Sequence, residues 1–400
     1  MRSKWSFIVA LMVLAGILLS ACGGGGGGEA NTDIKVGAIF DLTGPTSDVG
    51  TPYSEGVRDY VAWLNANGGV DGHKIDLIWA DYAYKVDQAE QLYSQYVNEG
   101  VVAFQGWGTG DTEALRSKIA ADKIPFMSAS YSANLTDMEK SPYNFLIGVT
   151  YSDQAIIAIQ WAIQDWQAAG NSGMPKVAII HHDSPFGESP VADAQAFAES
   201  KGVGFMHIAM PKGATDYVAE LAQIQQFGAN YVVIHTVSSP AAVLVKDAKS
   251  QGLMDSIKFI NMNWCADEGF INLAGDAAEG VYGTIPFTPP SSPVPGHDAP
   301  AQWLKDHGSS LDEKGVHYVQ GWWTMAVMAE GIKRALANGG DVTGESIKNA
   351  LETIKNFDTG GVTAPITFTP QSHRGSTALR IYTVKDGKWV TVTDDYISAP

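Results

Sequence analysis

Residues 101–134, VVAFQGWGTGDTEALRSKIAADKIPFMSASYSAN, decide the fold. The runs at 101–105 and 125–127 are short, apolar and of strand length, and residues 111–122 between them carry apolar side chains at the spacing of one helical face. The first run ends in a glycine-rich turn, and the second ends in a loop of small and hydroxyl residues. In an open parallel sheet such loops lie side by side at the carboxyl edge, where ligands bind. The stretch therefore predicts a β-α-β unit with a ligand site at its strand ends.

The glycine-rich turn at 106–110 suits an anion better than a dinucleotide. A dinucleotide loop reads Gly-x-Gly-x-x-Gly, whereas here the third glycine comes one position early and Trp107 would crowd a pyrophosphate. A carboxylate needs only two or three donors at a positive helix end. Gly108, Thr109, Ser130 and nearby amides could supply them. A carboxylate site is the favoured interpretation, and a structural turn without ligand is the alternative.

Composition excludes several classes of function. The chain has 400 residues, 45% hydrophobic and 17% charged, which fits two or three globular domains. Its net charge of -17 argues against nucleic-acid binding, which needs basic patches. The two cysteines, Cys22 and Cys265, leave no expectation of a disulfide or a cysteine-based metal site, because Cys22 ends an export signal.

Residues 1–22 predict export with lipid anchoring. Arg2 and Lys4 precede an apolar run at 7–19, and the following Leu-Ser-Ala-Cys resembles a bacterial lipobox whose Cys22 is acylated. The alternatives are an ordinary secretory signal and, less favoured, a transmembrane helix, for which the apolar run is short. Residues 23–32, rich in glycine, read as a flexible tether.

From residue 34 onward, strand-like and helix-like segments alternate, which indicates an α/β protein with a parallel sheet in each half. Predicted strands lie at 34–40, 75–79, 176–181, 205–208, 231–235 and 258–261. Predicted helices lie at 52–67, 86–98, 155–168, 192–201, 218–227, 241–251 and 318–338. A hairpin is expected across Asp386-Gly387, and the break between the halves falls near 149–153.

Catalytic motifs are weak. His181-His182-Asp183 suggests a metal site or an acid/base pair, but neighbouring side chains on a strand point opposite ways. One core-facing and one rim histidine is the better interpretation. Neither Gly-x-Ser-x-Gly nor His-Glu-x-x-His occurs in the sequence, and no pair of acids in one loop suggests glycoside hydrolysis.

The chain resembles the type I periplasmic solute-binding proteins of ABC importers, in the branched-chain amino-acid-binding (Leu/Ile/Val-binding) family. The family pattern is a strand, Thr-Gly-Pro, a glycine, a helix ending Asn-x-x-Gly-Gly-x-x-Gly, and a strand ending in Asp. Its counterparts here are Thr43-Gly44-Pro45, Gly50, Asn65, Gly68-Gly69, Gly72 and Asp81. Further matches are IPFMSASYSANLT, HHDSPFGES and GWWTMAVMAEGI, and the resemblance runs from about residue 34 to the C-terminus.

The resemblance implies two doubly wound, Rossmann-like lobes joined by three hinge crossings, with ligand in the cleft. Placed on this sequence, the N-terminal lobe is 33–150 plus 284–370. The C-terminal lobe is 151–283 plus 371–400. The crossings then fall near Val149, Thr284 and Pro370.

The resemblance also implies binding residues, with departures. Gly108 stands where relatives usually have serine, and Tyr131 stands where threonine is common. Asn263 replaces the acid that commonly holds the ligand's ammonium, which puts an α-amino acid in doubt. Aromatic residues also gather at the expected cleft, namely Tyr82, Tyr84, Trp107, Tyr131, Phe186, Trp264, Trp322 and Trp323, with Trp264 and Trp323 assigned mainly to the core. The predicted ligand-binding residues are Tyr82, Trp107, Gly108, Thr109, Ala129, Ser130, Tyr131, Phe186, Thr236, Asn263 and Trp322.

These observations predict an extracytoplasmic, lipid-anchored solute-binding protein that is not an enzyme and uses no cofactor or metal. Its expected partners are a small carboxylate, the permease and ATPase subunits of an ABC importer, and the membrane through its lipid, but not nucleic acid, and it is expected to be a monomer. The carboxylate is expected to carry an aromatic or bulky apolar body, slightly ahead of a standard α-amino acid. The alternatives are a ligand-sensing subunit of a signalling system and an enzyme on the same scaffold.

Overall fold

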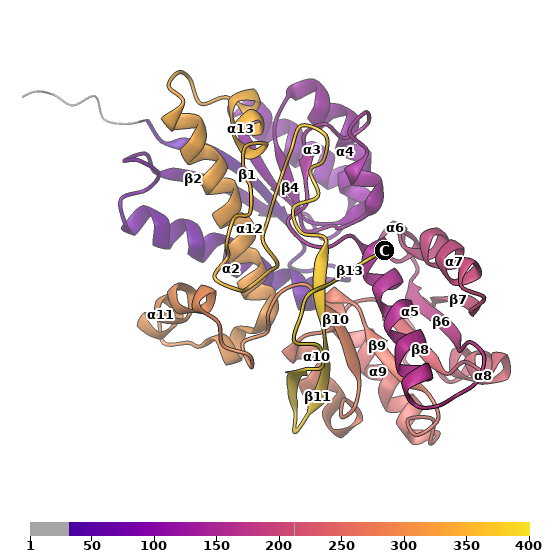
Figure 1. The fold of residues 1–400 in the computed structure, drawn as a ribbon. Helices are drawn as coiled ribbons and strands as arrows, with labels where there is room; N and C mark the ends of the chain where they lie inside the picture. Colours follow the sequence, from indigo (N-terminus) through magenta and orange to yellow (C-terminus); the bar gives the residue numbers. More distant parts are fainter. Residues whose placement is uncertain (1–31, 212) are drawn as a thin grey trace, which may run out of the picture. The chain divides into compact units, whose positions relative to one another are not determined.

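The computed structural model describes residues 32–211 and 213–400, and the fold is that of the unit from Ile34 to Pro400 (Figure 1). The predicted signal segment, Cys22 and most of the predicted tether lie outside the described residues. Within the described part of the chain, no helix combines the length and the apolar character that crossing a bilayer requires.

The first sheet contains the deciding stretch. Its strands are all parallel and follow the order β2-β1-β3-β4-β5. They are β1 (Ile34–Phe40), β2 (Ile75–Asp81), β3 (Ala103–Gly106), β4 (Phe126–Ser128) and β5 (Asn144–Phe145). Gly106 pairs with Ser128, the last residues of β3 and β4, so the glycine-rich and hydroxyl-rich loops leave the sheet side by side. The predicted β-α-β unit is confirmed.

Helices from both ends of the chain cover this first sheet. The early ones are α2 (Ser47–Ala66), α3 (Val86–Asn98) and α4 (Thr109–Asp122). The late ones are α11 (Asp298–Asp306), α12 (Leu311–Ala337) and α13 (Gly344–Leu351), drawn in orange beside the indigo elements in Figure 1. Helices α2 and α12 can approach closely because Gly56 and Gly321 have no side chain at their contact. A Cβ at either position would lie only 2.0 Å from a backbone oxygen of the other helix.

The second sheet follows the order β12-β11-β10-β9-β8-β6-β7. Its strands are β6 (Lys176–His182), β7 (Gly204–Met210), β8 (Tyr231–His235), β9 (Lys258–Asn261), β10 (Tyr282–Ile285), β11 (Ala378–Lys385) and β12 (Lys388–Thr391), and β13 (Ile397–Ser398) pairs with β11. The strands from β7 to β10 are parallel, but β11 and β12 are antiparallel, so this sheet is mixed rather than purely parallel. The hairpin predicted at Asp386-Gly387 is confirmed, with both residues at positive φ.

The helices of the second lobe are α5 (Tyr151–Ala168), α6 (Pro185–Glu188), α7 (Val191–Ser200), α8 (Val218–Phe227), α9 (Ser238–Ser250) and α10 (Glu268–Ala274). The chain passes between the two sheets three times: after β5, after β10 and before β11. The predicted lobe boundaries, 33–150 plus 284–370 and 151–283 plus 371–400, stay a prediction.

Several helices begin earlier than the sequence indicated, and the two largest differences are at α2 and α12. Helix α2 starts at Ser47 rather than 52, and α12 starts at Leu311 rather than 318. In α12 the backbone leaves helical geometry at Gly315, with φ 74° and ψ -176°, and then resumes. The apolar period that predicted the helix begins only after this glycine, which is why the first turn was missed.

Candidate ligand-binding site

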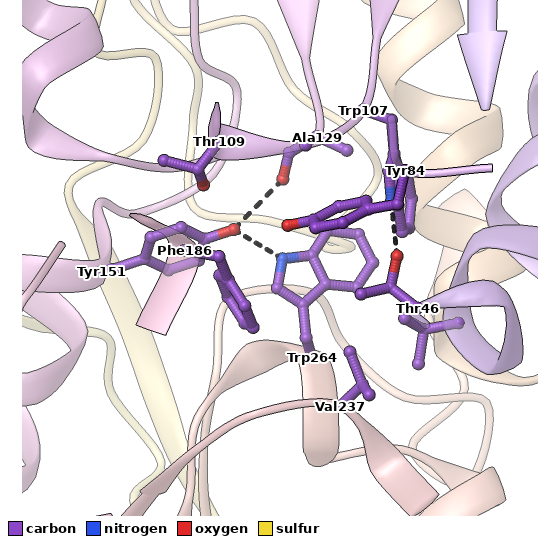
Figure 2. Close-up of a pocket in the computed structure, with 11 residues that line it drawn as sticks. Thr46, Tyr84, Trp107, Thr109, Ala129, Tyr151, Phe186, Val237 and Trp264 are labelled. Atoms are coloured by element: carbon purple, nitrogen blue, oxygen red, sulfur yellow. Dashed lines mark hydrogen bonds between the residues drawn. The ribbon is translucent and has the colours of Figure 1, made fainter. Parts of the chain in front are cut away.

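A small cavity lies where the carboxyl ends of the two sheets meet (Figure 2). On the first lobe its wall comes from the segments after β1, β2, β3 and β4, and on the second from the start of α5 and the segments after β6, β8 and β9. The lining residues are Thr46, Val49, Tyr84, Trp107, Gly108, Thr109, Ala129, Tyr151, Phe186, Val237 and Trp264. None of these described lining residues carries a charged side chain. The position is the one where open α/β sheets bind ligands.

Hydroxyl groups form one side of the cavity. The Oγ1 atom of Thr109 lies 2.6 Å from the Oγ atom of Ser130, and this pair joins the loops after β3 and β4. The hydroxyl of Tyr151 accepts a hydrogen bond from Nε1 of Trp264 at 2.8 Å and donates to the carbonyl of Ala129 at 3.5 Å (Figure 2). Because Thr109 is the first residue of α4 and lines the cavity, the first amides of that helix begin at this side and have no partner within the helix. The arrangement supplies neutral donors to an anion.

The glycine at 108 makes room for a buried carboxyl group. Asp111 accepts hydrogen bonds from the Gly108 N–H at 3.2 Å and from the Tyr82 hydroxyl at 2.9 Å. A Cβ on residue 108 would lie 2.2 Å from Oδ1 of Asp111 and 2.7 Å from the Tyr82 oxygen. Burial raises the pKa of Asp111 to about 6. The Gly108 N–H, expected to be bare, is therefore already occupied, and the following amides of α4 are the ones left for a ligand.

Aromatic rings form the other walls. The Trp107 and Trp264 rings meet edge to face, with centroids 4.9 Å apart, and Trp107 donates from Nε1 to Oγ1 of Thr46 at 2.9 Å (Figure 2). Tyr84 adds a third ring from a turn in which Ala83 and Tyr84 both have positive φ, 49° and 58°. Such backbone is costly for residues other than glycine and concentrates at functional sites. The cavity is thus flat-walled and apolar opposite its hydroxyl side.

Two titratable groups at or directly behind the cavity wall are uncharged at neutral pH. His235 lies behind Phe186, with Nε2 3.0 Å from the Phe186 carbonyl oxygen, and burial lowers the pKa of His235 to about 3, so it carries no charge. Burial also raises the pKa of Tyr151 above its ordinary range, so its hydroxyl keeps its proton. Across residues 32–211 and 213–400, no group of His, Cys, Asp or Glu has an arrangement that could hold a metal ion.

The structure brings some predicted residues to the cavity and leaves others away from it. Those that line it are Trp107, Gly108, Thr109, Ala129 and Phe186. Those directly behind its wall are Tyr82, bonded to Asp111, Ser130, bonded to Thr109, and Tyr131, whose ring stacks on Trp264 with centroids 6.3 Å apart. Those that do not line it are Thr236, Asn263 and Trp322.

Trp322 and Asn263 miss the cavity for local reasons. Trp322 packs against Tyr60 and Trp63 of α2, with ring centroids 5.4 and 5.5 Å apart, because the neighbouring Gly321 faces α2. Asn263 is the first residue of a short 3-10 turn, and its backbone N–H donates to Oε1 of Gln154 at 3.1 Å.

Sequence reasoning missed six of the lining residues as binding residues: Thr46, Val49, Tyr84, Tyr151, Val237 and Trp264. Tyr84 and Trp264 belonged to the set of cleft aromatics, but Trp264 was assigned mainly to the core. Trp264 belongs to both the core and the site, because the residue is only 4% exposed and still lines the cavity. The signal available for Tyr151 was its place at the break between the lobes, directly after the helix-capping Thr150.

Comparisons with known proteins bear on the family and the fold of the chain. A family model described as periplasmic binding protein matches residues 33–388. The Leu/Ile/Val-binding protein homolog 2 of Brucella abortus (strain 2308) is 26% identical over 267 residues, which are 66% of this chain and 70% of that protein.

Solved structures are similar over most of the chain. A branched-chain amino acid ABC transporter from Thermus thermophilus with bound valine has a TM-score of 0.85 and 29% identity, covering 92% of this chain and 97% of that one. A solute-binding protein of an ABC transporter from Rhodopseudomonas palustris HaA2, in complex with p-hydroxybenzoic acid, has a TM-score of 0.77, and coverage of 92% and 98%. It is 22% identical, so that likeness concerns the fold alone. The predicted two-lobed α/β fold is confirmed.

Proposed function

The chain belongs to the periplasmic binding protein family, and from that premise we propose that it captures a small organic carboxylate between its lobes and delivers it to the permease of an ABC importer. The observation that carries the proposal is the uncharged cavity at the meeting of the two sheets, with hydroxyl and amide donors on one side and aromatic walls on the other. Buried ligand sites are mostly apolar with a few placed polar groups.

The donors support a carboxylate as the recognised group. The first-turn amides of α4 and the Thr109 hydroxyl are neutral donors at a positive helix end, which suits an anion. Hydrogen bonds to a charged acceptor contribute about 1.5–3 kcal/mol each, so two or three of them hold a carboxylate without a basic residue.

The walls favour an aromatic or flat apolar body without an amine. A buried ammonium needs an opposite charge, and none of the described lining residues supplies one. Trp264, rather than an acid, stands at the cavity beside Asn263. The similar proteins with bound valine and with bound p-hydroxybenzoic acid provide the two ligands to compare.

Ligand identity is tested directly. Mass spectrometry of small molecules released by denaturing the purified protein should detect an intact aromatic or apolar acid. Calorimetry with p-hydroxybenzoic acid and with valine, leucine and isoleucine should favour the aromatic acid. Tight binding of the aliphatic amino acids with none of the aromatic acid would overturn the ligand class.

Val237 offers a charge test with a matched control. It lines the cavity and is the N-cap residue of α9, a position where Asp and Asn are both favoured. Val237→Asp should weaken an amine-free acid by placing like charge in a desolvated cavity, whereas Val237→Asn should weaken it much less. If the Val237→Asp variant binds the acid more tightly than the Val237→Asn variant, the proposed placement of a carboxylate in this cavity is wrong.

Lipid anchoring is proposed from the sequence alone, because Cys22 lies outside the described residues. Two acyl chains hold a protein at a membrane stably, where one is marginal. Cys22→Ala should move the protein into the soluble exported fraction. Retention of that variant on membranes after a high-salt wash would contradict the anchor.

A further inference from the structure

The lobes contact each other through a carboxylate from the first lobe at a helix start of the second. Asp48 lies in the first turn of α2, and its Oδ2 accepts from the N–H of Ser239 at 2.9 Å and from its hydroxyl at 2.6 Å. Ser239 is the second residue of α9, and first-turn amides have no partner within their own helix. Asp48 therefore caps α9 across the lobes.

A second carboxylate makes the reciprocal contact. Glu268, the first residue of α10 in the second lobe, accepts at Oε2 from the N–H of Val316 at 2.8 Å. Helix α12 breaks at Gly315 and restarts at Val316, so this amide opens a new helical segment. A Cβ on residue 315 would lie 2.7 Å from Oε2 of Glu268, so the glycine makes the break and also leaves room for the carboxylate.

A histidine–aspartate pair connects these two contacts to the cavity wall. Nε2 of His317, the residue after Val316, lies 3.2 Å from Oδ2 of Asp267, the residue before Glu268. The His317 ring packs on Trp264 with centroids 4.8 Å apart, and Trp264 lines the cavity. The two capped helix starts and the cavity wall therefore form one connected structure across the lobes.

We propose that Asp48 and Glu268 are positioning residues that together latch the lobes over the ligand cavity, each by capping a helix of the opposite lobe. Carboxylates at helix starts satisfy unpaired amides and interact favourably with the helix dipole. The latch rests on the proposed function, in which closure over a ligand retains it. It sets how long the ligand stays, without touching the ligand.

Amide exchange in ligand-free protein tests the latch. Because both caps depend on the same closure, removing one must expose the amide of the other. Glu268→Ala should speed exchange of the Ser239 amide, and Asp48→Ala should speed exchange of the Val316 amide, each about two- to thirty-fold, the range of a lost cap. Asp48→Asn keeps an acceptor oxygen and should restore most of the protection.

Glu90→Ala, at an exposed position on α3, is the control and should leave both amides unchanged. The latch is overturned if each cap variant speeds only the amide that it contacts, or if Asp48→Asn exchanges as fast as Asp48→Ala. Because the exchange experiment is done without ligand, its result does not depend on the ligand's identity. A failed search for a ligand would count against the proposed function and would leave the exchange result intact.

Discussion

Replacing Gly108 tests why a residue without a side chain stands at the start of α4. A Cβ at residue 108 would lie 2.2 Å from Oδ1 of Asp111, a distance that forces the carboxyl group to move. Two hydrogen bonds end on that group, from the Gly108 N–H at 3.2 Å and from the Tyr82 hydroxyl at 2.9 Å. The φ of Gly108 is -82°, so backbone strain adds nothing.

The magnitude follows from those bonds. A hydrogen bond to a charged group contributes about 1.5–3 kcal/mol, so Gly108→Ala should lower the free energy of unfolding by about 3 kcal/mol or more. Gly110→Ala is the matched control in the same helical turn, because its Cβ would meet only ordinary contacts at 3.6 Å or beyond. It should be neutral or stabilising by about 0.5–1 kcal/mol.

Urea unfolding of both variants, followed by circular dichroism, measures the difference. Gly108→Ser should be at least as damaging as Gly108→Ala, even though the family resemblance implies a serine at this position. If Gly108→Ala unfolds at the urea concentration of the wild type, the Asp111 carboxyl group does not fill that space, and the explanation of the glycine is wrong.

Two further predictions concern titration and the Tyr151 hydroxyl. Burial raises the pKa of Glu268 to about 7 from 4.5, and for His317 burial lowers the pKa while Asp267 raises it to a net increase. Burial also raises the pKa of Asp48. An open form that exposes these groups to water releases protons that the closed form holds, so closure should weaken as pH rises through about 7. The neutral Glu268 carboxyl group still accepts the Val316 N–H through one oxygen, so protonation does not remove that contact. Glu268→Gln should flatten the pH dependence in scattering measurements of ligand-free protein between pH 5 and 8, and an equally steep variant would refute it. Tyr151→Phe leaves the Trp264 N–H buried without its 2.8 Å acceptor and should cost about 1–3 kcal/mol in urea unfolding, and wild-type stability would contradict that bond.

The part of the site that follows β3 and β4 could be predicted because strand order decides it. The loops carrying Thr109 and Ala129 follow adjacent parallel strands, and a run of apolar residues followed by small ones identifies such loops in the sequence. Phe186 was predicted through the family resemblance and also lines the cavity.

The remainder depended on rotations that the sequence does not encode locally. Successive residues of a helix point about 100° apart, so the orientation of one residue sets those of its neighbours. With Gly321 against α2, Trp322 packs on other side chains of α2, and Gln320 is the residue that donates to the Tyr131 hydroxyl at 2.7 Å. In the same way, the 3-10 turn that begins at Asn263 places Trp264, the next residue, at the cavity instead of Asn263. Resemblance aligned the position but could not settle which side chain the turn presents.

The edge-to-face contact of Trp107 and Trp264 gives the protein a built-in optical probe. The two indoles belong to different lobes, and their ring centres are 4.9 Å apart, which is close enough for their electronic transitions to couple. Any opening of the lobes separates them, so the near-ultraviolet circular dichroism signal should report closure without an attached dye. Trp107→Phe identifies the share of the spectrum that belongs to this pair, against the background of the chain's 11 tryptophans.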